Sequence, residues 1–177
     1  MPKPLSEHSI DDLKRLAVNY RAAGVTEGKH FTLADIMREI DRRQGGALTL
    51  DNLTSIIATS CLTAPERKVS YRELYLAMHG QPPAQGFVGN GWRIPLTSKL
   101  RELSELCHAH GWPLISILVV DNKTRRLTTD TETAFYHDWK DKYPIKAVNA
   151  EKWCQQMTEQ ALEFVRRHPG SFGPLAA

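Results

Sequence analysis

The chain is 177 residues long, which is enough for one hydrophobic core or for two small lobes that share a boundary. Apolar residues make up 41% of it and charged residues 24%, a composition that excludes wholesale disorder. With 23 Lys and Arg against 20 Asp and Glu, the net charge is +3, which permits nucleic acid as a partner but falls far short of a histone-like chain.

The cysteines and the apolar runs predict a cytoplasmic protein. Cys61, Cys107 and Cys154 are far apart and form no Cys-x-x-Cys pair, so they fit a reducing compartment better than a disulfide framework. The polar, proline-broken start differs from a signal peptide. The longest strongly apolar run covers residues 114–120 and is far too short to span a bilayer, so we expect no membrane contact.

Residues 1–65 are predicted to form a helical N-terminal region. Ser9 is a suitable cap for a first helix, in which apolar residues recur at helical spacing. A second helix is expected over 33–43, where a pair of glycines stops it. A third helix opens at Thr49 or Asp51.

A winged-helix-like region is predicted over residues 66–130. A Ser-x-x-Glu capping box opens a helix over 71–79, and a loop rich in glycine and proline leads to a helix over 97–110. The β-branched run 114–120 predicts a strand, and residues 125–129 are expected to return as a second strand after a polar turn. Helix, loop, helix and β-hairpin is the order of the second half of a winged helix.

The C-terminal segment, residues 131–177, is predicted to add two helices, over 131–140 and 149–167, that pack on the winged-helix-like region. The whole chain is therefore expected to be an α+β protein, mainly helical with a small β-hairpin. These parts are also compatible with one single compact domain.

One stretch of the chain resembles a known family. The sequence Val69-Ser-Tyr-Arg-Glu-Leu-Tyr-Leu-Ala-Met-His-Gly80 is similar to the Val-Ser-Tyr-Gly-Glu-Leu-Ala helix of the DNA alkyltransferases and alkyltransferase-like proteins. Trp112-Pro-Leu-Ile-Ser-Ile-Leu-Val-Val120 then stands where those proteins carry Asn-Pro-Leu-x-x-x-x-Pro-Cys-His-Arg. The resemblance, over about residues 69–120, implies a winged-helix DNA-binding scaffold. It implies no alkyl transfer, because no Cys, His or Arg follows the apolar run, and the family's arginine-bearing recognition helix has no clear equivalent.

Basic residues are in excess between Arg93 and Arg126, where six of them stand against three acidic residues. Three of the six lie in the predicted hairpin tip, where a wing would meet phosphates, although an exposed turn is also commonly charged for solvation alone. Trp92 lies in the glycine-rich loop and could anchor a partner. The predicted nucleic-acid-binding residues are therefore Arg93, Lys99, Arg101, Lys123, Arg125, Arg126 and Trp92.

Two motifs could carry metal chemistry. Cys107-His108-Ala109-His110 offers a thiolate and imidazoles, but adjacent helical positions point in different directions and no second ligand pair follows, so we expect no metal there. Asp121-Asn122-Lys123 matches half of a restriction-type nuclease site, which needs a second carboxylate at its metal ion. Asp130 and Glu132 are the nearby acids, and they fit better as caps of the next helix.

The leading hypothesis is a non-catalytic nucleic-acid-binding protein with DNA as the expected target and no cofactor. A protein-binding adaptor or inhibitor, of the type found in phages and mobile elements, is the alternative, since the mild charge and the aromatic residues also suit a protein partner or a homodimer. A metal-dependent nuclease using Asp121 and Lys123 is the second alternative.

Overall fold

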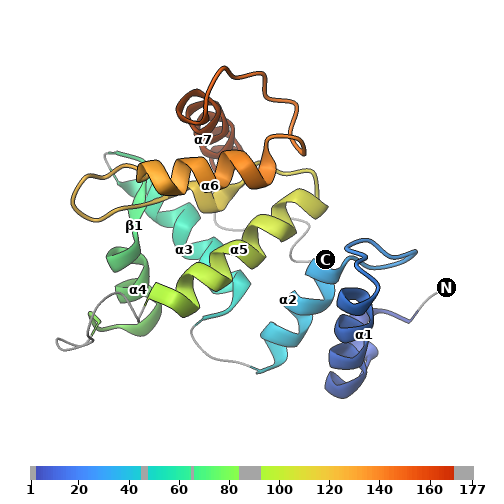
Figure 1. Cartoon of the computed structure of the whole chain (residues 1–177). Helices are drawn as coiled ribbons and strands as arrows, with labels where there is room; N and C mark the ends of the chain where they lie inside the picture. Colours follow the sequence, from blue (N-terminus) through green and yellow to red (C-terminus); the bar gives the residue numbers. More distant parts are fainter. Residues whose placement is uncertain (1–2, 45–47, 65, 84–92, 170–177) are drawn as a thin grey trace.

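The computed structural model describes residues 3–44, 48–64, 66–83 and 93–169 (Figure 1). Within these ranges the chain is mainly helical with a small two-stranded sheet, which confirms the predicted α+β class. No helix in them is both long and apolar enough to cross a membrane. In chain order the elements are η1 (Leu5–Glu7), α1 (Ile10–Ala22), α2 (Leu33–Gln44), α3 (Leu50–Thr63), β1 (Val69–Ser70), α4 (Tyr71–His79), α5 (Arg93–Ala109), η2 (Ile115–Leu118), β2 (Val119–Val120), α6 (Thr129–Trp139) and α7 (Ala150–Arg167).

Several helices begin where a side chain caps the free backbone amides of the first turn. Ser9 caps α1 and Thr49 caps α3, each by accepting a hydrogen bond from an amide three residues ahead. Ser70 and Glu73 form a full capping box at the start of α4. That helix ends at His79, and the following Gly80 has a φ of 70°, the left-handed conformation that glycine adopts without strain. Local chemistry alone therefore fixes these boundaries.

The large core surrounds the segment 114–120, every residue of which is buried. α3, α5 and α7 pack against η2, and α6 packs on α7 (Figure 1). Trp153 of α7 and Leu106 of α5 are fully buried in this core. Ile57 of α3 is fully buried in this core as well. Helix α3 therefore packs with the C-terminal part of the chain, whereas the sequence analysis placed it in the helical region of residues 1–65.

The first two helices, which we call the N-terminal pair (α1 and α2), have a separate small core. Leu13 and Ala17 of α1 meet Ile36 and Ile40 of α2 there. The pair joins the rest of the molecule through polar contacts and through Ala34, which packs against the large core. The polar contacts include His110 with Asp35 at 2.8 Å, Arg38 with Asp51 at 2.8 Å, Lys99 with Asp41 at 3.0 Å, and the amide of Leu50 with Asp41 at 2.7 Å.

The predicted β-hairpin is wrong. Ile115–Leu118 forms a 3₁₀ turn, and only Val119–Val120 is a strand, which pairs in parallel with Val69–Ser70 and not with a returning segment. Residues 121–128 form a turn that leads directly into α6. The apolar run is buried on all sides, so it occupies the middle of the core and lacks the solvent-facing side of a hairpin strand.

The start of α5 also differs from the prediction, which placed it near residue 97. The described residues are helical from Arg93 onward, and Leu96 is buried against the large core.

Candidate functional site

The candidate site lies where the two parallel strands end. Val69 pairs with Val119 and Ser70 with Val120, so the chain leaves both strands at the same edge of the sheet. The buried Ser70 hydroxyl contacts the Asn122 side chain across this edge, with 3.1 Å between Oγ and Oδ1. Segments 66–73 and 121–126 therefore lie side by side although about 50 residues separate them.

Arg125 fastens the two segments together. Its guanidinium donates hydrogen bonds to Glu66 at 2.8 Å, to Glu73 at 2.6 Å and to the carbonyl oxygen of Lys68 at 3.1 Å. Its φ of 55° is unusual for a residue with a side chain and costs backbone energy, which these three bonds offset. A phosphate would therefore have to compete with the carboxylates of Glu66 and Glu73, which already form ion pairs with Arg125.

The other predicted cations do not converge on one face. Lys99 is mostly buried and pairs with Asp41 of α2 and Glu102 of its own helix. Arg101 lies on a different side of α5, is 75% exposed and lines a groove between α5 and α6. Side chains two positions apart on a helix point in nearly opposite directions, which explains this divergence.

Arg93, Lys123 and Arg126 lie near the strand ends. Arg93 is half-buried and places its guanidinium 5.4 Å from the centre of the Tyr71 ring. Lys123 and Arg126 are exposed in the turn that follows β2. Trp92, the remaining predicted residue, lies outside the described residues.

Two further cations, Arg67 and Arg72, were missed by sequence reasoning. Both are exposed in segment 66–73, beside the turn that carries Lys123 and Arg126. None of these four side chains forms an ion pair with another described residue. We call Arg67, Arg72, Lys123 and Arg126 the basic edge. The pairing of two distant strands creates it, and no signal within either segment could have revealed it.

The acidic residues at this edge are already engaged. Segments 66–73 and 121–126 together contain six basic and three acidic residues, an excess of three that equals the net charge of the whole chain. Glu66 and Glu73 hold Arg125. Asp121 accepts bonds from the amides of Thr124 and Lys123, which lower the pKa of its carboxyl. The basic edge is therefore a locally uncompensated positive surface.

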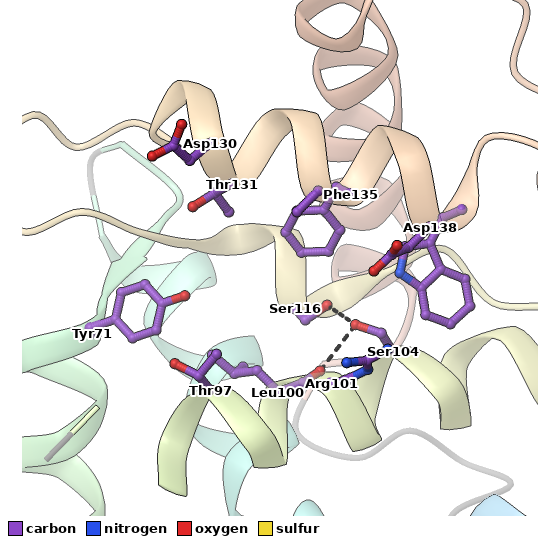
Figure 2. A pocket seen from close by; sticks show the side chains of 12 residues that line it. Tyr71, Thr97, Leu100, Arg101, Ser104, Ser116, Asp130, Thr131, Phe135 and Asp138 are labelled. Atoms are coloured by element: carbon purple, nitrogen blue, oxygen red, sulfur yellow. Dashed lines mark hydrogen bonds between the residues drawn. The ribbon is translucent and has the colours of Figure 1, made fainter. Parts of the chain in front are cut away.

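A groove between α5 and α6 adjoins the basic edge (Figure 2). Its main hollow has a volume of about 320 Å³. A second hollow of about 240 Å³ shares Tyr71, Thr97 and Thr131 with the first and is also lined by Arg93 and Asp121. Burial raises the pKa of the Tyr71 hydroxyl, so it stays protonated at neutral pH. The groove thus runs from the strand ends to Trp139 at the end of α6.

The two metal motifs are used in structural contacts. Cys107 is fully buried, and burial raises its pKa to about 12. His108 packs against the rings of Trp139 and Tyr143, while His110 bonds Asp35. In the part of the chain that the structure describes, no three His, Cys, Asp or Glu side chains come together as a metal site. The Asp121 carboxylate accepts hydrogen bonds from the amides of its own turn.

Comparisons of this chain with protein-family models, with curated proteins and with solved structures find no match. Function is therefore inferred from the chain's own residues and surfaces.

Proposed function

We propose that the protein binds nucleic acid, with DNA as the expected target, through the basic edge. The observation that carries this proposal is the charge balance at the strand ends, where all three local carboxylates are engaged and four exposed cations are not. Phosphate binding by Lys and Arg needs clustered charge but no strict spacing, and it gains free energy from the release of counterions.

The rigidity of the edge supports the same proposal. Arg125 locks the turn of residues 121–126 against segment 66–73, so Lys123 and Arg126 are held near Arg67 and Arg72. Cations that are already positioned lose less conformational freedom when they bind a phosphate backbone. The protein is proposed to bind without catalysing a reaction. The three free cysteines fit the cytoplasm as its location.

Fluorescence anisotropy with labelled duplex DNA, single-stranded DNA and RNA tests the proposal. Binding that uses all four cations should weaken with salt with a log–log slope of about −3 to −4 on duplex DNA. The double variant Lys123→Ala/Arg126→Ala should lower the affinity about tenfold or more at low salt and reduce the slope by about two.

The matched control is Lys14→Ala/Lys146→Ala, which removes two exposed lysines far from the basic edge in the sequence. Equal losses in the two double variants would show a non-specific effect of net charge and contradict the assigned surface. No binding of any of the three nucleic acids at low salt would end the proposal. A stoichiometric protein complex that survives nuclease treatment would favour the adaptor alternative.

A further inference from the structure

The floor of the groove between α5 and α6 is a pair of buried hydroxyl groups. Ser104 of α5 and Ser116 of η2 are 3% and 2% exposed, and their Oγ atoms are 2.6 Å apart. The Ser104 hydroxyl also lies 3.0 Å from the carbonyl oxygen of Leu100, as the dashed lines in Figure 2 show. Both serines line the main hollow.

The hydrogens of this pair can be assigned by counting. A hydroxyl group has one hydrogen, and a carbonyl oxygen can only accept. Ser104 therefore donates to Leu100, and Ser116 must donate to Ser104. The Ser116 Oγ then has no hydrogen left for the groove but keeps acceptor capacity. Because a buried polar atom is normally satisfied, a molecule in the groove would be expected to offer Ser116 an N–H or O–H donor.

The walls of the groove favour an apolar body beside that donor. Leu100 and Trp139 are buried and Phe135 is half-buried, and all three line the hollow. Figure 2 shows Phe135 pointing from α6 toward α5, across the space above Ser116. The volume of about 320 Å³ lies at the small end of the range for ligand sites, so it suits one ring and a short chain.

The charges at the groove favour a cation. Asp130 and Asp138 of α6 both line it, and Asp138 points toward the α5 side (Figure 2). The basic residue of the main hollow is Arg101, which is 75% exposed and lies 3.9 Å from Glu105. The Asp138 carboxylate thus lies on the same side as a guanidinium that has an acid of its own. The ring of Phe135 can also attract a cation through its negative face, whereas the ring of Trp139 already has the Lys142 ammonium 4.2 Å from its centre.

We propose that this groove binds a small organic amine, in which a protonated primary amino group is attached to a compact apolar body. The amino group donates hydrogen bonds to Ser116 and is attracted by Asp138, while the body packs between Phe135, Leu100 and Trp139. This site is separate from the basic edge and does not depend on the proposed binding of nucleic acid.

Titration with 2-phenylethylamine, followed by the backbone amide signals of Ser116 and Ala134 in nuclear magnetic resonance spectra, tests the proposal. For a ligand of this size we expect a dissociation constant on the order of 1 mM. Phenyltrimethylammonium carries the charge without an N–H, and 3-phenylpropionate carries the opposite charge. Both should bind about tenfold more weakly or not at all. Equal binding of either, or no binding of the amine, would overturn the proposal.

Three conservative variants test the assigned roles. Ser116→Ala should weaken the amine about tenfold. Asp138→Asn should weaken it several-fold, whereas Asp141→Asn, an equal change at an exposed aspartate that does not line the groove, should leave it unchanged. Unchanged binding in Ser116→Ala, or equal losses in the two aspartate variants, would contradict the assignment. Thermal unfolding of each variant identifies any that fails to fold.

Ser104→Ala gives the sharpest test, because it removes the acceptor that takes the Ser116 hydrogen. Ser116 can then donate into the groove. The ketone 4-phenylbutan-2-one, which can only accept hydrogen bonds, should bind Ser104→Ala several-fold more tightly than it binds the wild-type protein. An unchanged or weaker affinity for the ketone would show that the hydrogens are not arranged as proposed.

Discussion

The N-terminal pair and the large core are stabilised in different ways. The pair of α1 and α2 closes on four buried apolar residues, while the large core takes buried side chains from α3 to α7 and from the segment 114–120. Hydrogen bonds and ion pairs join the two regions, whose buried apolar residues form separate clusters. Since apolar burial dominates folding free energy, the N-terminal pair is expected to open locally before the large core unfolds.

The largest expected effect is in the large core. Ile57→Ala removes a fully buried side chain from α3, and the cavity that it leaves should lower the free energy of unfolding by about 4 kcal/mol. Urea denaturation measures this loss, with Ile94→Ala as the control because Ile94 is 71% exposed. The amides of α3, α5 and α7, which belong to the large core, should lose protection from hydrogen exchange together. Loss confined to α3 would contradict the view of one cooperative core.

A similar cavity in the N-terminal pair should act locally. Ile36→Ala also removes a fully buried side chain, and we expect a loss of about 3 kcal/mol for the small core, whose open surroundings relax more easily. Native-state hydrogen exchange should show faster exchange in α1 and α2 and unchanged exchange in α5 and α7. Equal acceleration in all four helices would show that the two regions unfold as one unit.

The contact between the two regions should be weaker than either core. Lys99→Met breaks the ion pair with Asp41, in which both side chains are 14% exposed, and should cost about 2 kcal/mol because Asp41 keeps its charge in a partly buried place. The control is Arg101→Met, which removes an exposed ion pair with Glu105 at 3.9 Å. This change should lower the free energy of unfolding by less than about 0.5 kcal/mol. Equal costs for the two variants would remove the distinction between the structural Lys99 and the exposed Arg101.

The smallest effect should depend on pH. Hydrogen bonds from Arg42 and Arg43 lower the pKa of Glu39 to about 2, from an ordinary value of 4.5. Because the pKa of Glu39 is lower in the folded state, its ionised carboxylate stabilises the folded protein at pH values above about 4.5. This stabilisation is lost as the pH falls from about 4.5 toward 2.

Glu39→Gln should therefore cost about 1 kcal/mol at neutral pH, and this cost should decrease as the pH falls toward 2. Denaturation curves across this pH range measure the difference. The exposed Glu7→Gln serves as the control that should change little at any pH. A constant cost of Glu39→Gln at every pH would show that lost packing, and not the charge, explains the effect.

The helices were predictable because their signals are local. Ser9, Thr49 and Ser70 cap the helices that the sequence assigned to them, and apolar spacing found the buried faces. The run 114–120 was misread as a hairpin strand because a continuous apolar segment has no period that distinguishes a strand from another buried conformation.

The candidate site was predictable only in part. Lys123 and Arg126 were found because charged turns are visible in the sequence, whereas Arg67 and Arg72 required the pairing of β1 with β2. Lys99 and Arg125 have the same charge as these residues, and only the positions of Asp41, Glu66 and Glu73 distinguish them. The hydroxyl pair of the groove joins α5 to η2 and was not visible either.

The sequence by itself determined the composition class, the order of the helices and most of their ends, because caps and periodicity act over a few neighbouring residues. The tertiary structure alone decided the partner of each strand, the carboxylate beside each cation and the acceptor left at the base of the groove. These three features depend on which distant segments pack together. Burial of apolar side chains drives that packing, and no short stretch of sequence reveals which segments will be partners.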